Sequence, residues 1–289
     1  MTELVVLGAG GMLGRALVEH LALHAPLAAT RADADVTNPD ALQRFIPERA
    51  TVINASAYTD VDGAESDEAA AFAINADAVR LIAETVKAKS GRLIHISTDY
   101  VFDGTASKPY DERSIRSPRS AYGRSKLGGE QAVEDILPDS GIIVRTAWLY
   151  GYPGQSFPTT ILRASQNLEF LDVVTDQVGQ PTWTGDVAAM VESLVVNDIR
   201  CGIFHATNSG QTSWYGFARA VFRQAGLDEE RIRPVTSEAF PRPAPRPSYS
   251  VLGHSAWDLQ GLQEPRPWED ALAEAWEREL HLVLGNTTP

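Results

Sequence analysis

The feature that most constrains the fold is a glycine loop near the N-terminus, with the sequence GAGGMLG at positions 8–14. It follows the apolar run Leu4–Leu7, which is β-branched in the middle, as buried parallel strands are. After the loop, Leu13, Leu17 and Leu21 recur at helical spacing and form one apolar face. The chain is therefore expected to open with a strand, a glycine turn and a helix.

This turn suits a dinucleotide for steric and electrostatic reasons. Glycine lets the backbone approach a pyrophosphate closely, and the helix N-terminus presents free N–H groups with a partial positive charge. A tight turn without a ligand is the alternative, but the position between a first strand and its helix favours the dinucleotide. The residues expected to bind it are Gly8, Gly10, Gly11, Met12, Leu13 and Gly14.

The choice between NADPH and NADH depends on the residues that follow the second strand, expected at 27–29. An arginine there suits the 2′-phosphate of NADPH, whereas an acidic side chain suits the free 2′-hydroxyl of NADH. The sequence offers Arg31 together with Asp33 and Asp35. Because Arg31 lies nearest to the strand end, the sequence favours NADPH and keeps NADH as the alternative.

The alternation of strands and helices continues along the first half of the chain. It predicts an α/β fold of the Rossmann type, with a doubly wound parallel sheet. The expected strands are 51–55, 92–96 and 142–146, and the expected helices are 69–89 and 121–134.

Beyond Gly151 prolines interrupt the apolar pattern, which indicates a smaller and less regular lobe. We expect an NAD(P)-binding domain over residues 1–150 and a C-terminal α/β substrate lobe over residues 151–289, with the chain free to cross between them. This lobe is expected to contain strands near 173–174 and 202–206 and helices near 186–196 and 214–225.

Charge and composition exclude several kinds of partner. The 25 Lys and Arg residues against 38 Asp and Glu give a net charge of −13, so nucleic acid is not an expected partner. No window approaches the 18 apolar residues of a membrane span, and the N-terminus lacks a leader pattern. The single cysteine, Cys201, and the lack of metal-site spacing predict a cytoplasmic protein without a bound metal.

A second group of residues predicts carbonyl chemistry. Tyr122 and Lys126 are four residues apart and share a helix face, where the ammonium can stabilise a phenolate whose free pKa is about 10. Thr98 and Asp99 follow a predicted strand, at the sheet edge where open α/β folds bind ligands. A surface pair and a turn cluster are the structural alternatives, but together with the glycine loop these residues favour a catalytic set of Thr98, Tyr122 and Lys126.

With these motifs the chain resembles the dTDP-4-dehydrorhamnose reductase family, within the extended short-chain dehydrogenases/reductases. The matching motifs occur in order along nearly the whole chain. They are the glycine loop, NASAYTDVD at 54–62, STDYVFDG at 97–104, YGRSKLGGE at 122–130, RTAWLYG at 145–151, DQVGQPT at 176–182, and Arg246-Pro247 with Ser250 and Leu252.

The resemblance implies reduction of the C4 ketone of dTDP-4-dehydro-L-rhamnose by NAD(P)H, which gives dTDP-L-rhamnose. It implies that Tyr122 donates a proton, that Lys126 holds the nicotinamide ribose and lowers the pKa of Tyr122, and that Thr98 polarises the ketone. It also places Thr98, Asp99 and Trp148 against the substrate. The further cofactor contacts that it implies are Asp35, Val36, Ala57, Tyr58 and Thr59, and further residues of the substrate lobe are Gln177, Thr182 and Arg246.

Other functions remain open at this stage. One is reduction of another nucleotide-linked ketosugar, and another is a non-catalytic regulatory subunit resembling the β subunit of methionine adenosyltransferase. Dehydration is disfavoured because the related dehydratases resemble STDE where this chain has Tyr100. A homodimer is compatible with the family, since some members dimerise through bridging Mg²⁺.

Overall fold

Six parallel strands build the central sheet of the computed structural model, which describes residues 3–285. Met1, Thr2 and the last four residues of the predicted second lobe lie outside the described residues. The strand order is β10-β5-β4-β3-β1-β2, so the direction of strand addition reverses next to β1. In this sheet the strands are β1 (Leu4–Leu7), β2 (Leu27–Ala29), β3 (Thr51–Asn54), β4 (Arg92–Thr98), β5 (Gly141–Thr146) and β10 (Gly202–His205).

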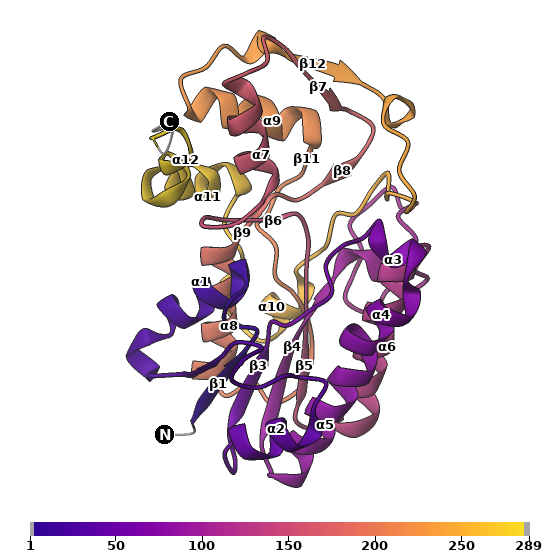
Figure 1. Ribbon diagram of the computed structural model, residues 1–289, viewed down its shortest axis with the longest axis vertical. Coiled ribbons are helices and arrows are strands. Elements are labelled where there is room, and N and C mark those ends of the chain that lie inside the picture. The colour runs from indigo at the N-terminus through magenta and orange to yellow at the C-terminus, as the bar shows by residue number, and fades with distance from the viewer. Residues whose placement is uncertain (1–2, 286–289) are drawn as a thin grey trace.

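Helices cover both faces of this sheet (Figure 1). On one face α1 and α8 pack against each other, and Leu17 and Val191 share a core with Val6 of β1. On the other face, Leu42 and Ile82 belong to a second core beneath α2, α5 and α6. The helices are α1 (Met12–His20), α2 (Pro39–Phe45), α3 (Gly63–Ser66), α4 (Glu68–Phe72), α5 (Ala78–Ala88), α6 (Ala121–Ile136) and α8 (Thr184–Val196), with a π-helical segment Ala73–Asp77 between α4 and α5.

A smaller lobe lies beyond the carboxyl edge of the sheet, at the top of Figure 1. Its core is rich in aromatic side chains, among them Tyr150, Phe217 and Trp268. Its helices are α7 (Phe157–Ser165), α9 (Trp214–Gln224), α11 (Trp268–Ala275) and α12 (Leu282–Gly285), with a π-helical segment Trp276–Leu280. Its strands are β6 (Leu149–Tyr150) paired with β9 (Thr182–Trp183), β7 (Leu171–Val174) with β12 (Ile232–Val235), and β8 (Val178–Gly179) with β11 (Thr212–Ser213).

Short helical turns complete the described chain. The helix α10 (Ser255–Leu259) packs against β10, where the indole of Trp257 donates to the His205 carbonyl oxygen at 2.8 Å. The 3₁₀ turns are Ala22–His24, Asp99–Val101, Glu229–Arg231 and Ser237–Ala239. Among the described helices, none has both the length and the apolar character that crossing a bilayer requires.

The predicted Rossmann-type fold is confirmed, but two placements were wrong. Residues 202–205 form a strand as expected, yet β10 is the sixth strand of the central sheet and pairs with β5, rather than lying in the smaller lobe. The helix α8 likewise packs on the central sheet beside α1. The local sequence reveals a strand but not its partner, and here Phe204 completes the core beneath α1 and α8. The division at residue 150 stays a prediction.

Candidate active site

A cavity of about 1250 Å³ opens where the carboxyl edge of the sheet faces the smaller lobe. Ligand pockets usually occupy about 300 to 1,000 Å³, so this cavity is larger than most. The predicted site residues on its wall are Gly8, Gly10, Gly11, Met12, Leu13, Arg31, Ala57, Thr59, Thr98, Asp99, Tyr122, Lys126 and Trp148, while Gly14, Asp35, Val36 and Tyr58 are not on it.

The glycine loop forms a close-packed turn at one end of the cavity. Gly8 has φ +79°, and a Cβ added there would lie 2.6 Å from the backbone nitrogen of Ser56. A Cβ on Gly14 would collide with the carbonyl oxygen of Gly8, so Gly14 serves the turn without facing the cavity. The helix α1 begins after Gly11 without a side-chain cap, which leaves its first N–H groups for a ligand.

The two candidates for recognising the cofactor ribose lie in different settings. Asp35 accepts hydrogen bonds from the N–H and hydroxyl of Thr37 at 3.0 and 2.7 Å, and these bonds lower the pKa of its carboxyl. Arg31 lines the cavity with 85% of its side chain exposed, and its Nε lies 3.2 Å from Asp35. The Oδ1 of Asp35 is therefore engaged by its own turn and its Oδ2 accepts from Nε of Arg31, while most of the Arg31 side chain stays exposed at the cavity.

The loop after β3 is fixed by a side chain that sequence reasoning missed. Asn75, in the π-helical segment, accepts from the N–H of Tyr58 at 2.9 Å and donates to its carbonyl at 3.0 Å. The same amide donates to Ser125 of α6 at 3.0 Å. These bonds to the backbone of Tyr58 hold its neighbours Ala57 and Thr59 at the cavity wall.

Tyr122 and Lys126 lie on the first turns of α6, where Ser120 caps the helix by accepting from the N–H of Gly123 at 3.0 Å. Lys126 is 2% exposed, and its Nζ donates to the carbonyl oxygen of Ile96 at 2.6 Å. Burial lowers the pKa of Lys126 to about 8, while the charge of Glu130 raises it.

The pKa of Tyr122 departs from the expectation. Burial, aided by the charge of Asp99, raises the pKa of Tyr122 to about 12, and a hydrogen bond with Thr98 opposes that rise. The structure therefore shows a raised pKa where the family resemblance implies one lowered by Lys126. Its physical reason is the loss of hydration around the phenol. A phenol in this state is protonated at neutral pH, as a proton donor must be.

Asp99 is a buried acid on the cavity wall. Its Oδ1 accepts from the hydroxyl of Thr98 at 2.9 Å, and among the described residues its Oδ2 has no hydrogen-bond partner. Burial raises the pKa of Asp99 to about 6, while hydrogen bonds with Ser250 and Thr98 oppose that rise. Buried polar atoms are normally paired, so an orphaned carboxylate oxygen at a cavity indicates a place for a ligand's donor.

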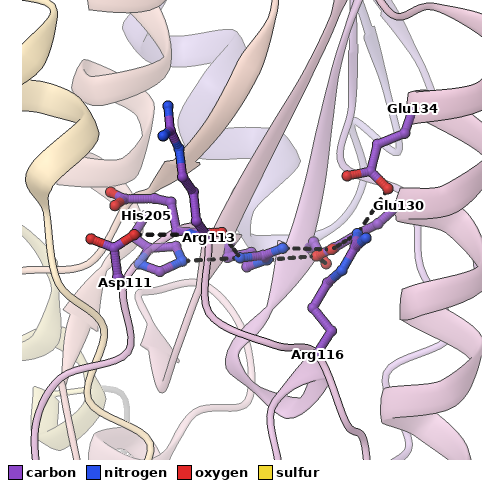
Figure 2. Close-up of polar contacts among 9 residues, drawn as sticks. Asp111, Arg113, Arg116, Glu130, Glu134 and His205 are labelled. Atoms are coloured by element: carbon purple, nitrogen blue, oxygen red, sulfur yellow. Dashed lines mark hydrogen bonds and ion pairs between the residues drawn. The ribbon is translucent and has the colours of Figure 1, made fainter.

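A buried ion-pair network supports this wall from behind and was not predicted (Figure 2). Glu130 and Arg145 are both 0% exposed and form two hydrogen bonds of 2.8 Å. Glu130 also accepts from Ser97 at 2.6 Å and from Arg116 at 3.1 Å, and Arg145 donates to His205 at 3.3 Å. Although burial favours a raised pKa, these donors together keep the pKa of Glu130 below its usual value. The signal in the sequence was Glu130, four residues after Lys126.

The opposite wall is aromatic. Trp148 stacks on Trp214 with ring centroids 3.5 Å apart and an angle of 7° between their planes. Trp148 has φ +44°, a conformation that costs about 1 to 3 kcal/mol for a residue other than glycine. The indole N–H of Trp214 donates to Gln177 at 3.2 Å. Trp214, from α9, and the cavity-lining Phe240 and Arg242 were not predicted, since no local motif marks them.

Comparisons with known proteins agree with this geometry. The family model described as the RmlD substrate binding domain matches residues 1–280. The chain is 49% identical to a "probable dTDP-4,6-dihydroxy-2-methyloxan-3-one 4-ketoreductase" of Streptomyces antibioticus, with 94% of each chain covered. It is 45% identical to the dTDP-4-dehydrorhamnose reductase of Mycobacterium tuberculosis, covering 94% of this chain and 92% of that one.

A solved structure extends the likeness to three dimensions. The crystal structure of a dTDP-4-dehydrorhamnose reductase from Bacillus anthracis in complex with NADP superposes with a TM-score of 0.90 at 34% identity. The match covers 96% of this chain and 99% of that one.

Proposed function

Because the chain belongs to the dTDP-4-dehydrorhamnose reductase family, we propose that it uses NADPH to reduce the C4 ketone of dTDP-4-dehydro-L-rhamnose, giving dTDP-L-rhamnose. The observation that carries this proposal is one cavity wall that combines the glycine turn, buried Lys126 and a protonated Tyr122. We place the reaction in the cytoplasm, where the exposed thiol of Cys201 stays reduced.

The residues at the glycine end fit a dinucleotide. The turn at Gly8 and Gly14 leaves no room for a Cβ, and the uncapped start of α1 offers N–H donors to a pyrophosphate. Arg31 is suited to a 2′-phosphate because its guanidinium is mostly exposed at the cavity. NADPH supplies the hydride for the reaction, and NADH, which lacks the 2′-phosphate, is expected to be the poorer donor.

Tyr122 and Thr98 would carry out the proton chemistry. Reduction places a negative charge on the former ketone oxygen, and the Tyr122 hydroxyl gives it a proton to complete the alcohol. The hydroxyl of Thr98, at the end of β4, hydrogen-bonds the phenol, and it would turn its one hydrogen from Asp99 to that oxygen in order to stabilise it. The phenolate that remains takes a proton from solvent before the next cycle.

Lys126, Asp99 and Trp148 would position the reactants. The Lys126 ammonium, held by the carbonyl of Ile96, is suited to the nicotinamide ribose. The free Oδ2 of Asp99 can accept from a sugar hydroxyl. Trp148 offers a flat apolar surface with one donor to the sugar nucleotide.

The direct test mixes the purified full-length chain with NADPH and dTDP-4-dehydro-L-rhamnose. Loss of the reduced-nicotinamide absorbance is followed, and the product is identified by NMR. We expect stoichiometric oxidation of NADPH with formation of dTDP-L-rhamnose. Absence of oxidation with NADPH still bound would contradict the substrate assignment.

A second candidate substrate follows from the relative that is 49% identical, which is named for a different dTDP-linked sugar. The same assay therefore includes other dTDP-4-keto-6-deoxysugars. If one of these sugars gives a higher kcat/KM, the proposed ketone reduction still holds, but that sugar is the substrate instead of dTDP-4-dehydro-L-rhamnose. Inert assays with every ketosugar would favour a non-catalytic role.

A further inference from the structure

A proline-rich segment spans from the smaller lobe to the mouth of the cavity. We call residues 240–247, with the sequence FPRPAPRP, the strap. Figure 1 shows this part of the chain, in orange, descending from β12 toward α3. Four of its eight residues are proline, which restricts the backbone and lowers the entropy lost when the strap is held in place.

The strap is tied to the rest of the protein on both sides. Before it, the N–H of Ser237 donates to the carboxylate of Asp176 at 2.9 and 3.0 Å. After it, the hydroxyl of Ser248 and the N–H of Tyr249 donate to the carbonyl oxygen of Gly104 at 3.0 and 3.1 Å. Between these ties Pro247 packs closely against Gly104, and the hydrogen bonds of the strap to the first half of the chain go to one carboxylate.

That carboxylate belongs to Asp62, which immediately precedes α3. Its Oδ1 accepts from the N–H of Ala244 at 3.2 Å, and its Oδ2 accepts from Nη2 of Arg246 at 2.8 Å. Nη1 of Arg242 lies 3.9 Å from the same oxygen, too far for a hydrogen bond. Asp62 is not on the cavity wall, but Arg242 and Arg246 both are. Asp62 therefore fixes the strap backbone and one guanidinium while it leaves the donors of Arg242 available.

The charge of this cluster favours an anion. Two guanidinium groups face one carboxylate, so this cluster of three side chains carries one net positive charge in a chain whose net charge is −13. Guanidinium groups bind phosphate oxygens with paired hydrogen bonds. A nucleoside diphosphate would bring its two phosphates to such a cluster while its sugar reaches Tyr122.

We propose that Asp62 is a positioning residue for substrate binding, which holds the strap across the cavity mouth so that Arg242 and Arg246 bind the diphosphate of a nucleotide sugar. The proposal rests on the proposed function for the identity of the ligand. It requires that Asp62 support the arginines and not compete with the ligand for them.

The test measures binding of dTDP and of thymidine to the full-length chain by titration calorimetry. Asp62→Ala is expected to weaken dTDP binding by about tenfold, the value of one charge-assisted hydrogen bond, and to leave thymidine binding unchanged. Asp62→Asn keeps an acceptor for Ala244 but lacks the charge, so we expect an intermediate loss. Asp139→Ala removes an exposed aspartate of a distant turn and is the matched control.

Hydrogen exchange provides a second readout. The N–H of Ala244 is expected to exchange faster in Asp62→Ala than in the wild type, while the strands of the central sheet keep their protection. Addition of dTDP is expected to slow exchange in the wild-type strap. An unchanged dTDP affinity in Asp62→Ala would overturn the proposal, and tighter dTDP binding would show that Asp62 competes with the ligand.

The outcomes separate this proposal from the proposed function. The wild type could bind dTDP, with weaker binding in Asp62→Ala, and yet reduce no ketosugar. That result would contradict the proposed reaction and support the proposed role of Asp62. A wild-type chain that reduces dTDP-4-dehydro-L-rhamnose with an unchanged KM in Asp62→Ala would contradict the strap alone.

Discussion

The two walls of the cavity are built from different interactions. On the wall at the sheet edge, Tyr122 and Lys126 lie on a helix that Glu130 ties to Arg145 without any exposure to solvent. On the wall of the smaller lobe, a stacked tryptophan pair lies beside a strap whose ion pair, Asp62 with Arg246, is about a quarter exposed. A buried network holds its groups in one arrangement, whereas partly exposed pairs allow small adjustments. The first wall therefore suits proton chemistry, and the second suits binding and release of a large substrate.

The largest expected effect concerns the proton donor. Tyr122→Phe removes the phenolic O–H but keeps the ring and its edge-on contact with Tyr100, so NADPH binding should persist. We expect kcat to fall by about 10² to 10⁴, the usual contribution of a positioned acid. Steady-state kinetics and a fluorescence titration with NADPH measure the two quantities. Turnover within a few-fold of the wild type would exclude Tyr122 as the donor.

The ion pairs of the two walls should contribute different amounts to the free energy of unfolding. Glu130→Gln leaves the buried Arg145 without its counter-charge, and we expect the free energy of unfolding to fall by about 3 to 5 kcal/mol. Asp62→Asn breaks a partly exposed pair and should cost about 1 kcal/mol or less. Urea unfolding of both variants gives the difference. Equal losses would mean that the two walls are equally rigid.

Cofactor preference should depend on Arg31. Arg31→Ala removes the cation suited to a 2′-phosphate, and we expect the KM for NADPH to rise about tenfold while the KM for NADH stays unchanged. The ratio of the KM for NADPH to the KM for NADH is measured for the wild type and for Arg31→Ala. A wild-type preference for NADH would instead return the ribose contact to Asp35, whose Oδ2 is held only by Arg31 among the described residues and could accept from a ribose hydroxyl.

The smallest effect is a displacement of the pH profile. Burial places the pKa of Lys126 at about 8, so its charge is present below that pH and is lost as the pH rises through it. The kcat/KM for NADPH should therefore decline above about pH 8. Because the charge of Glu130 raises the pKa of Lys126, Glu130→Gln should move this decline to lower pH. If the decline of kcat/KM stays at the same pH in Glu130→Gln, a group other than Lys126 is responsible for it.

The site features that could be predicted from the sequence are those that depend on residues close together in the chain. The glycine loop, the Tyr122–Lys126 pair and Thr98 each depend on spacing within one strand, turn or helix, and the structure brings them to one cavity. The cofactor contact predicted for Gly14 stays a prediction; in the structure Gly14 lies off the cavity wall and admits the backbone of Gly8. The cofactor contact predicted for Asp35 also stays a prediction: its Oδ1 accepts from Thr37, while its Oδ2 accepts from Nε of Arg31.

What could not be predicted depends on contacts between distant segments. Arg145 reaches Glu130 across 15 residues, Trp214 meets Trp148 across 66 positions of the chain, and Asp62 meets Arg246 across 184. No periodicity encodes such pairs, because each member looks like an ordinary residue of its own segment. The placement of β10 failed for the same reason, since the strand is evident and its partner is not.

One kinetic measurement addresses the division of labour between the walls: kcat and KM for dTDP-4-dehydro-L-rhamnose, determined in parallel for Tyr122→Phe and Asp62→Ala at saturating NADPH. We expect Tyr122→Phe to lower kcat with little change in KM, and Asp62→Ala to raise KM about tenfold with kcat within twofold of the wild type. A fall in kcat in both variants, or a rise in KM in both, would contradict separate roles for the two walls.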